Sequence, residues 1–160
     1  MSSAIRWPAE FSPAVAPIHV ANRLEIDAAA ADIWTELIQA IDWPKWYANS
    51  SNVRIEGGAS VLSEGARFTW WTFGVYLHST VEEFVPMERV GWTGRGLGLS
   101  VYHAWLIEPS GSGCLVSTEE TQFGLVARAG MLLFPQRMGR WHQRWLEGIA
   151  SRTERARSRE

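Results

Sequence analysis

The chain has 160 residues, a formal net charge of −2 and a single cysteine. This length suits one domain with its own core. The small net charge gives no general attraction to nucleic acid or anionic membranes. A single cysteine excludes an internal disulfide, which suits a reducing compartment. Because no stretch approaches the roughly 18 apolar residues of a membrane span, and residues 1–10 lack a signal-peptide core, we expect a cytoplasmic protein without an integral membrane segment.

Tryptophan is unusually frequent, with ten residues in the chain. The indole ring is bulky, and its N–H donor needs a partner when it is buried. So many rings indicate either a thick aromatic core or an aromatic-lined cavity, and composition alone leaves both interpretations open.

Residues 1–17 are expected to form an N-terminal arm. Three prolines within them prevent a regular helix or a central strand. Trp7 and Phe11 either anchor this arm to the body or leave it as a loose tail.

A strand and two short helices are predicted next. Residues 19–27 alternate apolar and polar side chains, as a half-buried strand does. Residues 28–40 carry a helical apolar stripe, for which Asp27 is the candidate N-cap. Pro44 interrupts that pattern, so a separate short helix is expected over residues 42–47.

The middle of the chain predicts an antiparallel sheet. Strand-like segments follow one another at hairpin spacing, separated by glycine or proline turns, which leaves no room for crossover helices. These segments are residues 53–56 with a continuation at 60–62, then 66–73, 76–85, 89–94, 99–108 and 114–123. With the first strand they make a sheet of six to seven strands.

Residues 129–157 predict a long C-terminal helix, with Pro135 either in its first turn or at a kink. The residues of its apolar side recur at helical spacing: Phe134, Met138, Trp141, Trp145 and Ile149. A helix with so broad an apolar side must bury it. We therefore expect the sheet to bend around this helix and to leave a cavity between them, and residues 158–160 to form a frayed tail.

Short motifs occur along the chain in a characteristic order. They are Ile26-Asp27-Ala28 with Asp32-Ile33-Trp34, then Asp42–Tyr47, Gly65–Trp70, Val90–Gly94, Val101–Trp105, Val116–Glu120 and Trp145-Leu146-Glu147. Over about residues 18–153 this order resembles the START-like, or SRPBCC, superfamily, and within it the members of the polyketide cyclase/dehydrase type. The resemblance implies an α+β helix-grip domain over residues 18–157, in which a strongly bent antiparallel sheet wraps a long C-terminal helix and two short helices follow the first strand. It does not select a function, because the superfamily includes cyclases, hydrolases, lipid and hormone carriers and co-chaperone-like proteins.

His103 and Glu120 are the candidates for catalysis. If the hairpin turns around residues 109–113, the two residues lie about equally far from the turn and so face each other across the strands. A carboxylate beside an imidazole in an apolar cavity can act as a general acid or base, as an aldol-type ring closure requires. The alternatives are a polar pair that tunes a binding pocket and a solvated pair on the outer side of the sheet.

No metal site or cofactor is predicted. The four histidines are scattered, and no two of them share a His-x-x-x-His or similar spacing. The chain also lacks a phosphate-binding glycine loop, a dinucleotide fingerprint and a nucleophile elbow.

The aromatic residues favour a pocket for a hydrophobic small molecule, because small-molecule sites typically set a few polar groups in an aromatic cleft. The alternative is that the rings only fill the core. His142 lies on the flank of the long helix and points either inward or to the surface. The residues expected to bind the ligand are Phe68, Trp70, Trp92, His103, Trp105, Glu120, Met138, Trp141, His142 and Trp145.

The outer side of the sheet is also expected to be covered. Trp71, Phe73 and Tyr102 alternate with the inward-facing residues, so both sides of these strands are apolar. Either the N-terminal arm or a second copy of the chain in a homodimer would cover them.

We therefore predict a protein that binds a lipid-, aromatic- or polyketide-like molecule. The first alternative is a cyclase or dehydratase that uses His103 and Glu120 for proton transfer. The second is a co-chaperone-like or assembly protein that uses its apolar outer side.

Overall fold

The computed structural model describes residues 4–157, so the tail expected at residues 158–160 lies outside the described residues. Its centre is a seven-stranded sheet with the strand order β1-β7-β6-β5-β4-β3-β2, in which all neighbours pair antiparallel. The strands are β1 (Ile18–Ile26), β2 (Ser50–Ile55), β3 (Arg67–Thr72), β4 (Val75–Val85), β5 (Arg89–Gly96), β6 (Leu99–Ser110) and β7 (Gly113–Phe123). This confirms the antiparallel sheet that the hairpin spacing predicts.

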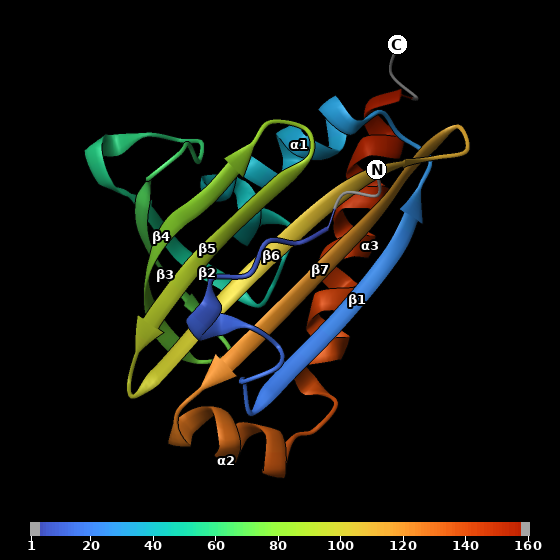
Figure 1. Ribbon diagram of the computed structural model, residues 1–160. Coiled ribbons are helices and arrows are strands. Elements are labelled where there is room, and N and C mark those ends of the chain that lie inside the picture. Colours follow the sequence, from blue (N-terminus) through green and yellow to red (C-terminus); the bar gives the residue numbers. More distant parts are fainter. Residues whose placement is uncertain (1–3, 158–160) are drawn as a thin grey trace.

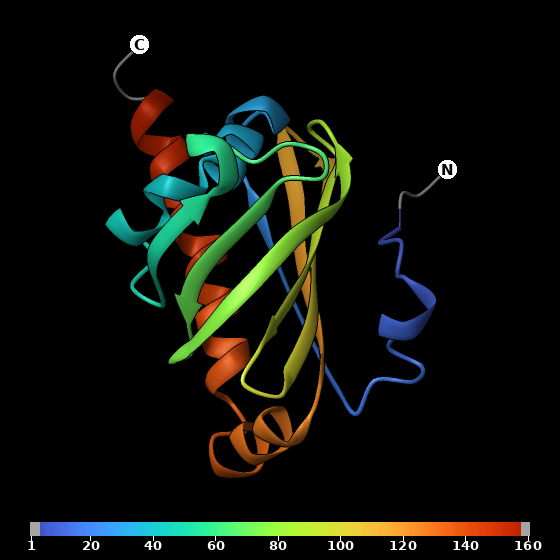
Figure 2. The same cartoon turned by 90° about the vertical axis from the view of Figure 1, so that its left-hand side faces the viewer.

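The helices pack on one face of the sheet. They are α1 (Ala30–Ile38), α2 (Leu125–Leu133) and α3 (Arg137–Arg157). The 3-10 segments are η1 (Ala9–Phe11), η2 (Ala40–Lys45) and η3 (Glu56–Gly58), of which η1 belongs to the N-terminal arm on the opposite face (Figure 2). Figures 1 and 2 show α3 running along this face, with α1 at one end of the sheet and α2 at the other. This arrangement confirms the helix-grip fold. Within residues 4–157, no helix is long and apolar enough to cross a membrane.

Pro135 separates two helices, and so neither alternative for the start of the long helix is right. Residues 125–133 form α2, and α3 begins only at Arg137. Proline lacks the N–H that would continue the helix. Phe134, expected on the buried side of the long helix, is instead the C-cap residue of α2, with 56% of its surface exposed.

Between residues 27 and 62, two local predictions are wrong and a third has shifted bounds. Asp27 does not cap α1: the N-cap is Ala29, without a side-chain hydrogen bond, and Asp27 accepts a 3.0 Å hydrogen bond from Ser112 Oγ. The short helix η2 spans residues 40–45 and not 42–47. Residues 60–62 form no strand, and the backbone N–H of Leu62 donates to the carbonyl of Ile38, outside the sheet.

Aromatic rings fill the space between α3, η2 and the sheet. Trp145 is buried and stacks on Tyr47 with ring centroids 4.3 Å apart. Its ring also meets Trp43 at 5.0 Å and Trp105 at 5.1 Å in edge-on geometry. Stacked and edge-on pairs stabilise by about 0.5–1.5 kcal/mol beyond their area burial. These rings therefore hold α3 at a fixed depth on the sheet.

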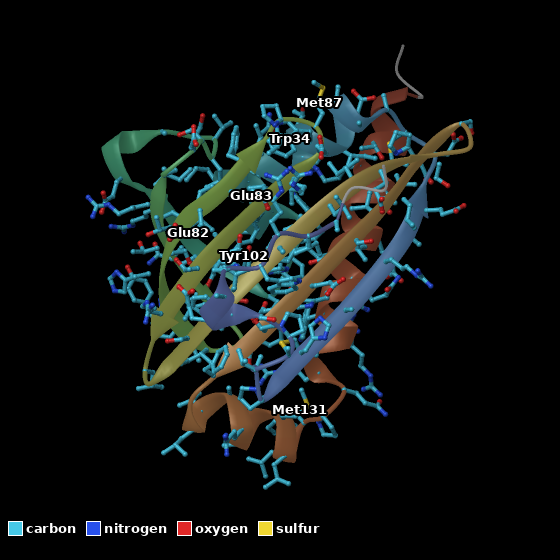
Figure 3. All side chains as sticks on the ribbon, viewed as in Figure 1. Trp34, Glu82, Glu83, Met87, Tyr102 and Met131 are labelled. Atoms are coloured by element: carbon cyan, nitrogen blue, oxygen red, sulfur yellow. The ribbon has the colours of Figure 1, made fainter. Side chains whose placement is uncertain are left out.

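The N-terminal arm is anchored on the opposite face (Figure 2). Phe11 is 3% exposed, and its ring lies 5.8 Å from those of Tyr102 and Phe123. Thr121 Oγ1 donates a 2.8 Å hydrogen bond to the carbonyl of Phe11. Figure 3 labels Tyr102 in the middle of the sheet, where the arm crosses it.

The residues expected to form a dimer surface do not share one exposed face. Tyr102 lies under the arm, and Trp71 is 44% exposed. Phe73 does not lie on the predicted side: it follows β3 in a two-residue turn with Gly74, where both residues have positive φ, as a type I′ hairpin turn requires. Strand alternation therefore does not apply to Phe73, and the homodimer itself stays a prediction.

Truncation of the arm's anchor should destabilise the fold. Phe11→Ala deletes a buried ring, and we expect it to lower the free energy of unfolding by about 3 kcal/mol. Urea denaturation followed by circular dichroism measures this change. Val15→Ala is the control, because Val15 lies in the same arm and is 61% exposed; equal effects of the two substitutions would show that the arm does not dock.

Candidate functional site

A cavity of about 120 Å³ lies between the sheet, α2 and α3. Strands β3 to β6 contribute Trp70, Leu77, Trp92 and Val101, and the helices contribute Ala127, Met131, Met138 and Trp145. Figure 3 labels Met131 on α2, at the end of the molecule away from α1. The walls are thus mostly apolar, and most of the polar residues that line them, Thr72 and Arg137 excepted, gather in one cluster.

The structure brings together most, but not all, of the residues expected to bind a ligand. Those that line the cavity are Trp70, Trp92, His103, Glu120, Met138, His142 and Trp145. Phe68 and Trp105 are buried in the aromatic core instead. Trp141 is half-buried on the outside of this core, between the ring of Tyr47 and the guanidinium of Arg144.

The contribution of α2 is missed by sequence reasoning. Val126, Ala127, Gly130 and Met131 line the cavity from this helix, yet residues 124–130 are expected only to lead into the long helix. Their spacing of three and four residues is the helical signal that could have identified this wall.

Three buried residues from three elements form the polar cluster of the cavity: His103 on β6, Glu120 on β7 and His142 on α3. His103 and Glu120 are directly opposite in the β6–β7 register, as the hairpin turn predicts. Glu120 Oε2 lies 3.2 Å from His103 Nδ1 and 3.2 Å from His142 Nε2. His142 is 1% exposed, so of the two orientations left open for it, the inward one is observed.

The hydrogen bonds around the cluster hold both strand residues in place. Gln122 Nε2 donates to Glu120 Oε1, and His103 Nε2 lies 2.7 Å from Thr118 Oγ1. In the proton assignment that satisfies these contacts, Thr118 donates to His103 Nε2 and His103 Nδ1–H donates to the Glu120 carboxylate.

The electrostatics of the cluster favour a neutral imidazole beside an ionised carboxylate. Burial lowers the pKa of His103 to about 3, and the nearby Glu120 carboxylate offsets only part of this effect. Burial alone would raise the pKa of Glu120, but the hydrogen bond from His142 and further donors hold it below its ordinary value. At neutral pH the cluster therefore carries a carboxylate that can accept protons, hydrogen bonds or a cation.

The same three residues could hold a metal ion. One ligand atom of each lies within 4.8 Å of the other two. The sequence predicts no metal site because its histidines lack a local ligand spacing. Such a spacing detects only ligands that are close in sequence, and these three residues come from different elements.

One protein family matches the chain over most of its length. The sequence profile of the family described as polyketide cyclase / dehydrase and lipid transport matches residues 17–154. The chain belongs to this family. None of the curated proteins matches the sequence significantly.

Solved structures share this fold. A hypothetical protein from Helicobacter pylori is 31% identical, with a TM-score of 0.87, and the alignment covers 96% of this chain and 98% of that one. A START superfamily protein from Mycobacterium smegmatis is 14% identical, with a TM-score of 0.70 over 86% and 98% of the two chains. The di-domain ARO/CYC StfQ of the steffimycin biosynthetic pathway is 14% identical, with a TM-score of 0.72 over 88% of this chain and 51% of StfQ. The last two likenesses concern the fold alone.

The lowered pKa of His103 should make the fold sensitive to acid. The unfolded chain protonates this imidazole below about pH 6.5, whereas the folded protein resists protonation until about pH 3. Protons therefore favour the unfolded state between these values, and His103 should remove about 2 kcal/mol of stability between pH 7.5 and pH 5. Urea denaturation of chelator-treated protein at both pH values measures this loss of unfolding free energy. His103→Gln should reduce the pH dependence by that amount, and an unchanged dependence would contradict the assignment.

Proposed function

We propose that this protein binds a hydrophobic small molecule, lipid-, aromatic- or polyketide-like, in the cavity between α3 and the sheet. The observation that supports this most directly is the shape of the site: an apolar, aromatic-walled cavity with one buried polar cluster. Sites of this composition are typical for small organic ligands, whose apolar part fills the cavity and whose polar part is oriented by few groups. The family description, which combines polyketide cyclases and dehydrases with lipid transport, agrees with this class of ligand.

Two unpaired ring nitrogens indicate the polar part of the ligand. Trp145 Nε1 and His142 Nδ1 are buried, have no hydrogen-bond partner among residues 4–157, and belong to side chains that line the cavity. A buried polar atom without a partner costs about 1–3 kcal/mol. A ligand with a hydroxyl or carbonyl oxygen could pair with either nitrogen, so we favour an oxygenated ligand over a pure hydrocarbon.

Filling the cavity should weaken binding without harming α2. Ala127 lines the cavity from this helix and is buried. Leucine suits a helix nearly as well as alanine does, but in Ala127→Leu its side chain takes up much of the cavity. We expect the affinity for the neutral fluorescent probe 1-aminoanthracene, measured by titration, to fall at least about tenfold, the equivalent of 1.4 kcal/mol.

Ala129→Leu is the matched control, since Ala129 lies on the same helix, is exposed, and does not line the cavity. Circular dichroism verifies that both variants fold. Equal affinities of the two variants for the probe would place its binding outside the cavity and contradict the proposal.

A second candidate function is an acid–base cyclase or dehydratase. The observation that favours it is the buried His103–Glu120 pair, with Nδ1 and Oε2 3.2 Å apart on the cavity wall. Ring closure of an aldol type needs a base that removes a proton next to a carbonyl group, and a neutral imidazole oriented by a carboxylate can serve. The family description, which names polyketide cyclases and dehydrases, makes a poly-β-ketone the substrate class to test.

His103→Ala separates the two functions. A carrier should keep its affinity for 1-aminoanthracene within about threefold, whereas a cyclase should lose turnover of a poly-β-ketone by about 10² or more. His19→Ala is the matched control, because His19 pairs with Glu119 at 2.7 Å on the exposed side of the neighbouring strands. Product analysis by liquid chromatography measures turnover; no product from the unaltered protein would remove the cyclase as a candidate for this substrate class.

A further inference from the structure

The spacing of the ligand atoms in the His103–Glu120–His142 cluster is close to that of a metal site. A tetrahedral zinc ion with nitrogen and oxygen ligands at 2.0–2.1 Å holds these ligands about 3.3 Å from one another. Glu120 Oε2 is 3.2 Å from both His103 Nδ1 and His142 Nε2, and all three atoms fall within 4.8 Å. Small shifts of the side chains would therefore let one ion bind to all three residues.

The charge of the cluster also favours a bound metal ion. Glu120 is buried, and its ion pairs within residues 4–157 are with the two imidazoles alone, without an arginine or lysine. Buried carboxylates are normally paired with a cation or coordinate a metal. A divalent ion between the three side chains would supply the missing positive charge.

Neighbouring residues are arranged as a supporting shell around such an ion. Metal-ligating histidines usually engage their second ring nitrogen in a hydrogen bond that fixes the ring. Thr118 Oγ1 lies 2.7 Å from His103 Nε2 and leaves Nδ1 for the metal. Gln122 Nε2 donates to Glu120 Oε1, which leaves Oε2 for the metal in the same way.

We propose that His103 Nδ1, His142 Nε2 and Glu120 Oε2 bind a divalent first-row transition-metal ion on the wall of the cavity. Two imidazoles and one carboxylate suit zinc, iron, cobalt or nickel better than magnesium or calcium, which prefer oxygen ligands. Three protein ligands leave a coordination position open. Because all three residues line the cavity, this position faces the space where the proposed hydrophobic ligand would lie, although metal binding itself does not depend on that ligand.

Zinc titration of the metal-free protein tests the proposal. The full chain without a polyhistidine tag is treated with a chelator, dialysed and titrated with zinc chloride in a calorimeter. We expect one ion per chain with submicromolar affinity. In His103→Ala, Glu120→Gln and His142→Ala the affinity should fall about a hundredfold or more, and in Thr118→Val, which removes only the supporting hydroxyl, by about tenfold.

A surface pair of the same residue types provides the control. His19→Gln and Glu119→Gln remove the His–Glu pair on the outer side, 2.7 Å apart, and should leave zinc affinity unchanged. Cobalt(II) absorption of the unaltered protein needs no variant: intense visible bands indicate a tetrahedral site with protein ligands. Absence of these bands together with no zinc binding, or zinc binding that survives all three ligand substitutions, would overturn the proposal.

Metal binding and binding of the hydrophobic ligand can be separated by experiment. 1-Aminoanthracene is titrated into the metal-free and the zinc-loaded protein. Probe binding without zinc binding overturns the metal site alone, and zinc binding without probe binding leaves the metal site standing and overturns the proposed ligand function.

Discussion

The packing of Trp145 against the sheet is the interaction on which the rest of the structure depends. Its ring stacks on Tyr47 and lies edge-on to Trp43 and Trp105, so α3 can neither rotate nor slide without breaking several ring contacts. Residues three and four apart on a helix share a face. The burial of Trp145 therefore also turns His142, one turn earlier, toward Glu120, and Met138, another turn earlier, toward Gln122, whose Nε2 lies 3.1 Å from Met138 Sδ.

The cavity exists because this aromatic packing stops part-way along α3. Toward the N-terminal end of α3, before His142, the wall opposite the sheet is formed by α2, which Pro135 separates from α3. Small residues of α2, such as Ala127 and Gly130, line the cavity. Small side chains at these positions leave space that tryptophans occupy elsewhere.

Strand β6 contributes residues to both faces of the sheet: Tyr102 anchors the N-terminal arm, and the next residue, His103, lines the cavity. Docking of the arm thus fixes the strand that presents the imidazole.

Sequence patterns predict the features that depend on neighbours in the chain. Hairpin spacing yields the meander, and the position of the turn at residues 109–113 is enough to set His103 opposite Glu120. Predictions fail where another part of the fold intervenes. The turn conformation of Phe73 moves it from the outer face to the cavity, and Ser112 engages the carboxylate expected to cap α1. The depth of α3, and with it the burial of His142, depends on ring contacts between distant elements that no local period encodes.

Stability alone does not explain the cluster. A buried ion pair is often no more stabilising than apolar residues of the same volume, because the lost hydration of the charges offsets their attraction. Most residues of the cavity wall are apolar, so a leucine in place of Glu120 would avoid such a loss. The carboxylate nevertheless meets two imidazoles and a glutamine amide. Such an arrangement is consistent with a cavity that receives a polar or charged partner, and His142 Nδ1 and Trp145 Nε1, which lack partners among residues 4–157, lie in the same wall.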